Sequence, residues 1–149
     1  MKEIVFAIEF KGSAAPVPGS ESRLRATTSA SGQTLRSLFK PDGIQAAIDP
    51  AGGDVARFES EVEIVGDGAF VESGTIAYGG AGRLTFRTLG RGVLGAAPVP
   101  GAQRGAVVWE VTGGEGRLAG AQGLITSNFV VGADGAVTDD QFARLYLPD

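Results

Sequence analysis

The stretch Tyr78-Gly79-Gly80-Ala81-Gly82-Arg83-Leu84 returns 34 residues later as Thr112-Gly113-Gly114-Glu115-Gly116-Arg117-Leu118. Each copy lies between segments in which every second residue is apolar, the pattern of a half-buried strand. Glycine adopts the positive φ angles of tight hairpin turns at no steric cost. We therefore expect each copy to turn the chain between two strands, with the Arg-Leu pair starting the next one. The repeat predicts an all-β, antiparallel meander.

Alternating segments extend this meander in both directions. Residues 3–11 alternate strictly, and so do residues 55–65, where one face is charged and the other apolar. Further strands are expected at 69–78, 83–89, 106–112, 117–130 and 137–147. Loops are expected at 12–19 and 90–105, and residues 40–54 are expected to hold two turn clusters around a short apolar piece, Ile44 to Ile48. Residues 20–40 fit either a strand with a loop or a short helical turn. The pattern favours one domain over residues 1–149, an antiparallel meander barrel of about eight strands, over a sandwich.

The composition excludes several kinds of chemistry. The chain has no cysteine and no histidine, which rules out Ser-His-Asp and Cys-His catalysis and histidine-liganded metals. Acid–base work is left to Asp, Glu, Tyr, Lys or Arg. The net charge is −4 and the basic residues form no stripe, so a nucleic-acid partner is not expected. Charges interrupt the N-terminal apolar stretch and no long apolar run follows, which predicts no signal peptide, no membrane partner and a cytoplasmic protein.

The segment Val107–Gly123 resembles a known signature. Its run Gly113-Gly114-Glu115-Gly116-Arg117-Leu118, followed by Gly120-Ala121-Gln122-Gly123, is similar to the Gly-Gly-Thr-Gly-Arg-Phe…Gly-Ala…Gly pattern of the allene oxide cyclase and dirigent barrels, and to small uncharacterised bacterial proteins. Glu115 stands in place of the usual Thr, and Leu118 in place of the usual aromatic residue. The resemblance implies an eight-stranded antiparallel barrel with a cavity, assembled as a homodimer or homotrimer. Members with known roles guide cyclisation or coupling of reactive lipids, polyketides or phenolic radicals, but none of their catalytic residues maps onto this chain, so only the fold carries over.

Two glutamates lie on strand faces that otherwise read as apolar, and they are the candidate catalytic residues. Glu72 falls in the series Phe70, Glu72, Gly74, Ile76, Tyr78, and Glu110 in the series Ala106, Val108, Glu110, Thr112. A carboxyl group that points into a barrel cavity has a raised pKa and can act as a general acid or base near neutral pH. The alternative is that these faces are outward, or that each glutamate pairs with an arginine.

Four further residues are candidate ligand contacts: Tyr78, Trp109, Asn128 and Arg144. Tyr78 and Trp109 offer an apolar ring with a polar atom, although aromatic residues also build ordinary cores and subunit interfaces. Asn128 and Arg144 lie on late, largely apolar strands and can orient a carbonyl or carboxylate group of a ligand. Solvation on an outward face is the alternative for both.

No cofactor or metal site is expected. The Gly-Gly-x-Gly corners lead into strands, whereas phosphate-binding glycine loops lead into helices. Glu59, Glu61 and Glu63 alternate along one strand, near Asp54 and Asp67, which is more typical of a solvated face than of a divalent metal site.

Two functional hypotheses follow. The first is a barrel that holds an apolar, lipid-like or polyketide-like small molecule, with cofactor-free cyclase or isomerase activity as the reaction class if it is an enzyme. The second is a non-catalytic binding or assembly barrel whose interior is filled by side chains. An open cavity lined by Glu72 or Glu110 and aromatic residues separates the first from the second.

Overall fold

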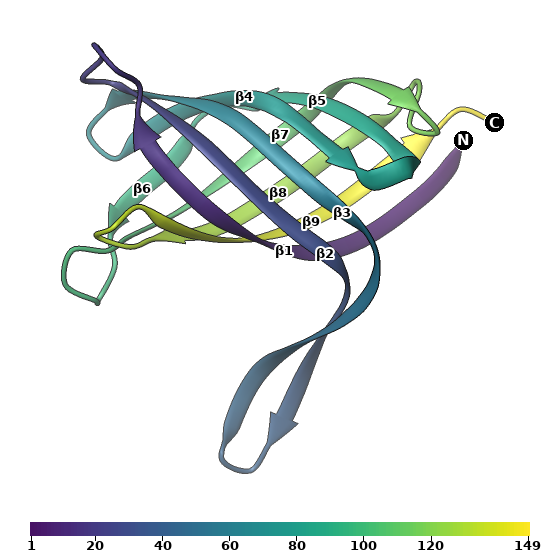
Figure 1. Cartoon of the computed structure of the whole chain (residues 1–149), viewed down its shortest axis with the longest axis horizontal. Coiled ribbons are helices and arrows are strands. Elements are labelled where there is room, and N and C mark those ends of the chain that lie inside the picture. The colour runs from purple at the N-terminus through teal and green to yellow at the C-terminus, as the bar shows by residue number, and fades with distance from the viewer.

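The computed structural model describes all 149 residues and consists of nine β-strands and one short 3₁₀ turn, with no α-helix (Figure 1). The strands are β1 (Lys2–Pro16), β2 (Arg23–Lys40), β3 (Gly43–Gly66), β4 (Ala69–Tyr78), β5 (Gly82–Thr88), β6 (Gly92–Ala96), β7 (Gln103–Gly116), β8 (Gln122–Val131) and β9 (Ala136–Leu147), and the turn η1 is Gly79–Ala81. No helix in the structure has the length and apolarity needed to cross a bilayer.

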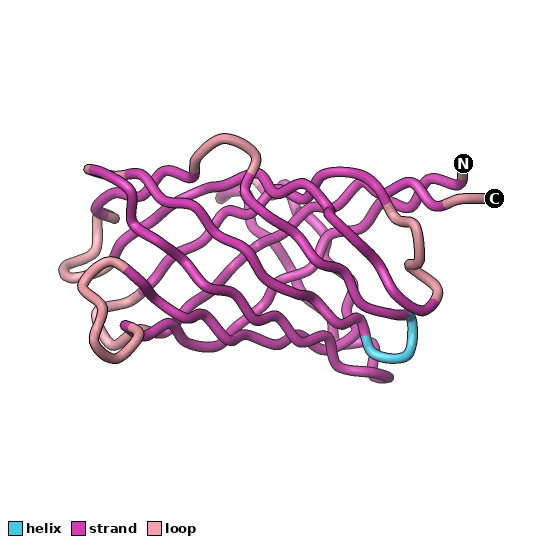
Figure 2. Tube along the Cα trace, turned by 90° about the horizontal axis from the view of Figure 1, so that it is seen from above, coloured by secondary structure: helices cyan, strands magenta, loops and turns pink.

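All strand pairs are antiparallel, and the sheet closes into a ring because the last strand, β9, pairs with β1, and β3 pairs with β4. β5 and β6 each lie between β4 and β7, so they share one position and the ring has eight positions. The tube seen from above in Figure 2 shows the closed wall with loops at one end and η1 at the other. The all-β antiparallel meander predicted from the sequence is confirmed, and the closed sheet is called the barrel below.

The two glycine-rich repeats become neighbours in the wall. The first copy turns the chain as expected, with φ of 56° at Gly79, the first residue of η1, and 136° at Gly82, which follows it. The second copy differs, because β7 continues through Gly116 and the turn follows at 117–121, so Arg117 and Leu118 do not begin a strand. Pairing of β5 with β7 sets Gly82 opposite Gly116. The buried Leu118 covers this end of the barrel.

Two regions expected to be loop or turn are strands instead, and β1 also runs through most of a third, the predicted loop 12–19, to Pro16. Residues 43–66 form one strand, and β2 extends to Lys40, so that Gln33–Lys40 and Gly43–Pro50 pair as a two-stranded hairpin, here called the arm, which projects from the barrel (Figure 1). The turn signals at 49–54 mark a bulge, where Gly52 and Gly53 have φ of 75° and 85°. The predicted loop 90–105 shrinks to 97–102, because β6 completes the wall beside β4. Pairing with neighbouring strands outweighs the local glycine and proline content in both places.

Side chains that alternate inward fill one half of the barrel. Phe10, Phe58, Phe86 and Trp109 are at most 2 % exposed, and the Phe86 and Trp109 ring centroids lie 4.4 Å apart. Phe58 contacts both of these rings at 5.4 Å. The strands predicted from alternation at 3–11 and 55–65 are confirmed, and their apolar faces point inward. This aromatic cluster closes the interior toward the end that holds η1 and the chain termini.

The first half of β1 forms a free edge. β1 pairs with β2 only from Lys11 onward, where the arm has already left the wall. At Glu9 the backbone N–H donates to Gln33 Oε1 over 2.7 Å, and Gln33 Nε2 donates to the Glu9 carbonyl oxygen over 3.4 Å. Backbone groups of every second residue face the same side of a strand, so those of Val5 and Ala7 also face away from β9, where they have no strand partner.

Candidate functional site

A cavity of about 440 Å³ occupies the half of the barrel opposite η1. It lies near the end formed by the turn at 66–68 and the loop at 97–102, which is the end opposite η1 in Figure 2. Its lining comes from every strand except β5. Twelve of the twenty lining residues are hydrophobic. An interior of this kind can hold a small apolar molecule, because ligand sites are mostly apolar with a few placed polar groups.

Strand register divides the lining into two layers. The outer layer, toward the mouth, is largely apolar and contains Leu24, Val62, Ile64, Phe70, Leu94, Phe129, Val131 and Val137, with Asp67 and Gln103 as its polar members. The inner layer lies deeper in the barrel. It contains the polar residues Thr28, Glu72, Ser127 and Asp139, together with Phe58 and Trp109. The cavity therefore has a largely apolar entrance and a polar inner end, here called the floor.

Glu72 lies at the floor with both carboxyl oxygens engaged. Ser60 Oγ donates to its Oε2 over 2.5 Å, and Trp109 Nε1 donates to its Oε1 over 3.2 Å. Thr88 bonds the backbone of Glu72 from β5, at 2.7 Å to the nitrogen and 3.0 Å to the oxygen. The side chain comes from the middle of β4 and faces inward, which is one of the two alternatives that the sequence left open. Its position is fixed by four neighbouring hydrogen bonds, which leaves the carboxyl group little freedom to rotate.

Asp139 on β9 is a second buried carboxyl group at the floor. Ser127 Oγ donates to its Oδ1 over 2.6 Å, and Gln141 Nε2 donates to its Oδ2 over 2.8 Å. Asp139 was not among the site residues predicted from the sequence, where it forms an acidic pair with Asp140. The signal that could have identified Asp139 as an inward residue is its place in the alternating series Val137, Asp139, Gln141, Ala143, Leu145. All five of these side chains are buried on one face of β9.

Burial shifts the titration of both groups toward neutrality. Desolvation raises the pKa of Glu72 to about 7, against the hydrogen bond from Ser60, which lowers it, and the nearby charge of Asp139 raises it further. Desolvation also raises the pKa of Asp139 to about 6, and its bonds from Ser127 and Gln141 oppose this rise. Groups that titrate near neutral pH can both accept and donate protons there.

Two polar atoms close to this floor are buried without a hydrogen-bond partner: Thr28 Oγ1 and Gln141 Oε1. Thr28 lines the cavity, and Gln141 holds Asp139 through its other amide atom. A buried polar atom without a partner costs free energy, on the order of 1–3 kcal/mol. Thr28 Oγ1 is an acceptor that a ligand donor can satisfy.

The two aromatic residues predicted to contact a ligand lie in different parts of the barrel. Trp109 lines the cavity and bonds Glu72. Tyr78 lies at the other end of β4, packed edge-on against Phe6 with ring centroids 5.3 Å apart, and does not line the cavity. Burial raises the pKa of Tyr78 well above its usual value, and its hydroxyl has no partner. Tyr78 is thus a core residue.

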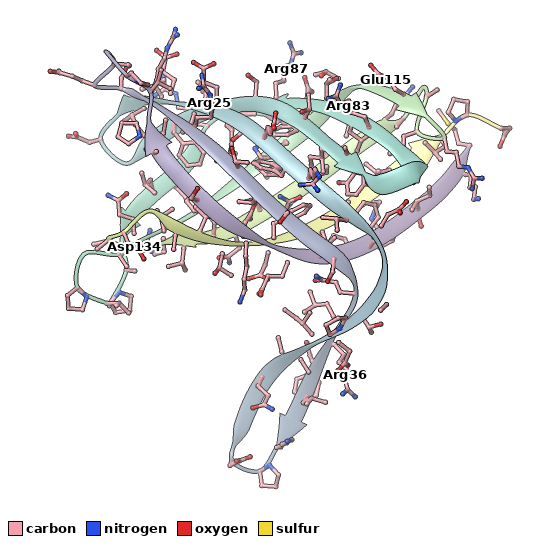
Figure 3. All side chains as sticks on the ribbon, viewed as in Figure 1. Arg25, Arg36, Arg83, Arg87, Glu115 and Asp134 are labelled. Carbon is pink, nitrogen blue, oxygen red and sulfur yellow. The ribbon has the colours of Figure 1, made fainter.

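Three predicted site residues lie on the outer wall, and the expectation that they face the interior is corrected. Glu110 follows the inward Trp109 and accepts a hydrogen bond from Arg87 Nε over 2.6 Å, while Arg87 points away from the barrel (Figure 3). Arg144 pairs with Glu3 over 3.1 Å. Asn128 is exposed, in a shallow outer groove. Alternation forces these positions outward, because their neighbours Trp109, Ser127, Ala143 and Leu145 are buried.

Comparison with protein-family models, curated proteins and solved structures finds no match to this chain.

Proposed function

We propose that this protein binds an apolar or amphipathic small molecule in its cavity and catalyses a proton transfer on it without a cofactor. The observation that carries the proposal is the coincidence of an apolar cavity with two buried carboxyl groups at its floor, Glu72 and Asp139. The volume of about 440 Å³ falls in the range of about 300–1,000 Å³ typical of small-molecule sites. The alternative of a filled, non-catalytic interior is less well supported, because this half of the barrel is not packed.

Glu72 is the proposed acid–base group. As a carboxylate it accepts a proton from a carbon of the bound molecule, and as a carboxylic acid it returns a proton to a different atom, which moves a double bond or closes a ring with no change of oxidation state. The bonds from Ser60 and Trp109 hold its oxygens in place, and the apolar walls exclude competing water. Such a reaction is that of a cofactor-free isomerase or cyclase. The resemblance to allene oxide cyclase and dirigent barrels, which is part of this proposal, points in the same direction.

The binding half of the proposal is tested by native mass spectrometry of protein purified from cells. We expect a bound small-molecule mass in the wild type and none in Ala26→Phe, where a ring added to a cavity-lining residue fills the space. Thr27→Phe places the same ring on the outward face and is the matched control, expected to retain the mass. Equal occupancy in all three proteins would place the ligand outside the cavity and end the proposal.

The catalytic half is tested with the released molecule in deuterated water. Wild-type protein is expected to exchange a carbon-bound hydrogen for deuterium, Glu72→Gln to lose this activity, and Glu110→Gln to retain it. Undiminished exchange by Glu72→Gln would remove the catalytic role and leave a binding protein.

Assembly with a second copy of the chain is a second proposed function, carried by the arm. Phe39 and Ile44 face each other across the arm and are 79 % and 76 % exposed. A two-stranded hairpin is marginally stable alone, whereas an added strand and an apolar cover stabilise it. The free edge of β1 offers unpaired backbone groups beside the root of the arm, so two copies that exchange arms satisfy both surfaces at once. A cytoplasmic location completes the proposal, supported by the cysteine-free sequence and by the charges within the N-terminal apolar stretch.

A further inference from the structure

The cavity carries an unbalanced negative charge. Three of its lining residues are acidic, Asp67 at the mouth and Glu72 and Asp139 at the floor, and none is lysine or arginine. All ion pairs of the protein lie elsewhere, and none includes Glu72 or Asp139. Buried carboxyl groups are ordinarily paired with a cation, because an isolated buried charge is costly. The chain itself supplies no such partner here.

The hydrogen bonds at the floor suit two carboxylates. Each of the four carboxyl oxygens of Glu72 and Asp139 accepts one bond, and every donor is neutral: two serine hydroxyls, one indole N–H and one amide N–H. An ionised carboxyl group is acceptor-only, so this pattern fits its needs. The donors orient the negative oxygens but do not cancel their charge.

The remaining groups around the floor also match a cation that donates hydrogen bonds. Thr28 Oγ1 lines the cavity, is buried without a hydrogen-bond partner and can accept a bond. Four aromatic rings line the cavity, Phe58, Phe70, Trp109 and Phe129. The face of an aromatic ring attracts a nearby ammonium group. Carboxylates, a free acceptor and ring faces together describe a site for a positive nitrogen.

We propose that the ligand of this cavity is an apolar amine, whose ammonium group lies between Glu72 and Asp139 and whose hydrocarbon body extends toward the mouth. The inference rests on the proposed function, since it names the chemical class of the molecule that enters the cavity. The ammonium group donates to the two carboxylates, while the body contacts the apolar layer of Leu24, Val62 and Val137. A ligand with a carboxylate head is disfavoured, because its charge would face those of Glu72 and Asp139.

Three probes of equal chain length separate head-group chemistry from burial: octylamine, octanol and octanoate. Trp109 is the only tryptophan, so its emission reports binding at the cavity floor. Near pH 8 a primary alkylamine is protonated, as lysine is. We expect octylamine to bind wild-type protein at least about tenfold more tightly than octanol, and octanoate more weakly than either. Glu72→Gln with Asp139→Asn should reduce the amine preference to within about twofold, while Glu110→Gln should keep it.

The outcomes distinguish this inference from the function on which it rests. Octanol and octylamine binding equally would overturn the amine assignment and leave a cavity that takes apolar molecules. No binding of any probe, measured also by calorimetry, would overturn both. If the double variant does not fold, titration of the wild type with octylamine near pH 5 replaces it. Protonation of Glu72 and Asp139 should there remove most of the preference over octanol, and a preference that persists would contradict the assignment.

Discussion

Trp109 Nε1 donates a hydrogen bond to Glu72 Oε1 over 3.2 Å across the floor of the cavity, and joins β7 to β4 through the interior. The two residues do not lie on adjacent strands, because β5 and β6 occupy the position between them. The bond therefore couples the candidate acid–base group to the aromatic cluster that closes the barrel. It also places the indole of the only tryptophan in direct contact with the Glu72 carboxyl group.

Emission from Trp109 should titrate with the Glu72 carboxyl group. Burial raises the pKa of Glu72 to about 7, so the charge beside the indole ring changes near neutral pH. We expect a step in emission intensity or wavelength centred near pH 7 in the wild type and no such step in Glu72→Gln. A step of the same midpoint and size in Glu72→Gln would assign it to another group.

Stability of the ligand-free protein should fall as pH rises through neutrality. The pKa of Glu72 is raised in the folded state from 4.5 to about 7, so the folded protein binds more protons than the unfolded chain between these values. The free energy of unfolding that Glu72 contributes is fully present below about pH 4.5 and lost by about pH 7. At 1.4 kcal/mol per unit, the loss is at most about 3 kcal/mol, with a smaller loss from Asp139.

Urea denaturation near pH 5 and pH 8 measures this effect. Glu72→Gln should lose less stability than the wild type between the two pH values and should be the more stable protein near pH 8. Glu59→Gln, on the outward face of β3, is the control and should follow the wild type. The expectation fails if Glu72→Gln and the wild type lose equal stability.

Glu110→Gln should change neither the free energy of unfolding nor ligand binding by much. Its partner Arg87 has a side chain that is 69 % exposed, and an ion pair in water contributes about 1 kcal/mol or less. We expect a change in the free energy of unfolding below about 1 kcal/mol and unchanged octylamine binding. A large loss of binding would show that this outer residue acts on the cavity, contrary to its position.

Removal of the apolar tip of the arm should dissociate the assembly. Phe39→Ser with Ile44→Ser takes two exposed apolar side chains from the arm without touching the barrel. Light scattering after size exclusion should show a dimer or larger assembly for the wild type and a monomer for the double variant. Val99→Ser, in the exposed loop 97–102, is the control and should keep the wild-type mass. A monomeric wild type would end the assembly proposal.

Alternation in the sequence predicted the fold and one half of the site. Strands with one charged face, such as 55–65, have only one face that can be buried, and the structure agrees there. Glu72 was found in the same way, since its series contains Phe70 and Ile76. In β7 both faces carry valines, so alternation alone could not say which is inward. The bulk of Trp109 decides it in the folded protein, and Glu110 is outward as a result.

Asp139 and the arm were beyond such reasoning for different physical reasons. Asp139 is buried because β8 supplies Ser127 as a donor, a contact between strands that no local pattern reveals. The arm is stabilised by pairing of Gln33–Lys40 with Gly43–Pro50, which outweighs the proline and glycine content of the second segment. Neighbouring strands, rather than local composition, determine both features.

The indole N–H signal of Trp109 in a ¹H–¹⁵N correlation spectrum tests the central claim most directly, since the protein has one tryptophan and hence one such signal. Titration with octylamine near pH 8 should shift this signal saturably, because the ammonium group enters beside the carboxylate to which the indole donates. Glu72→Gln should weaken the response. A Trp109 signal that stays in place while backbone signals of the arm or the outer wall shift would show that the amine binds outside the barrel and would contradict the account.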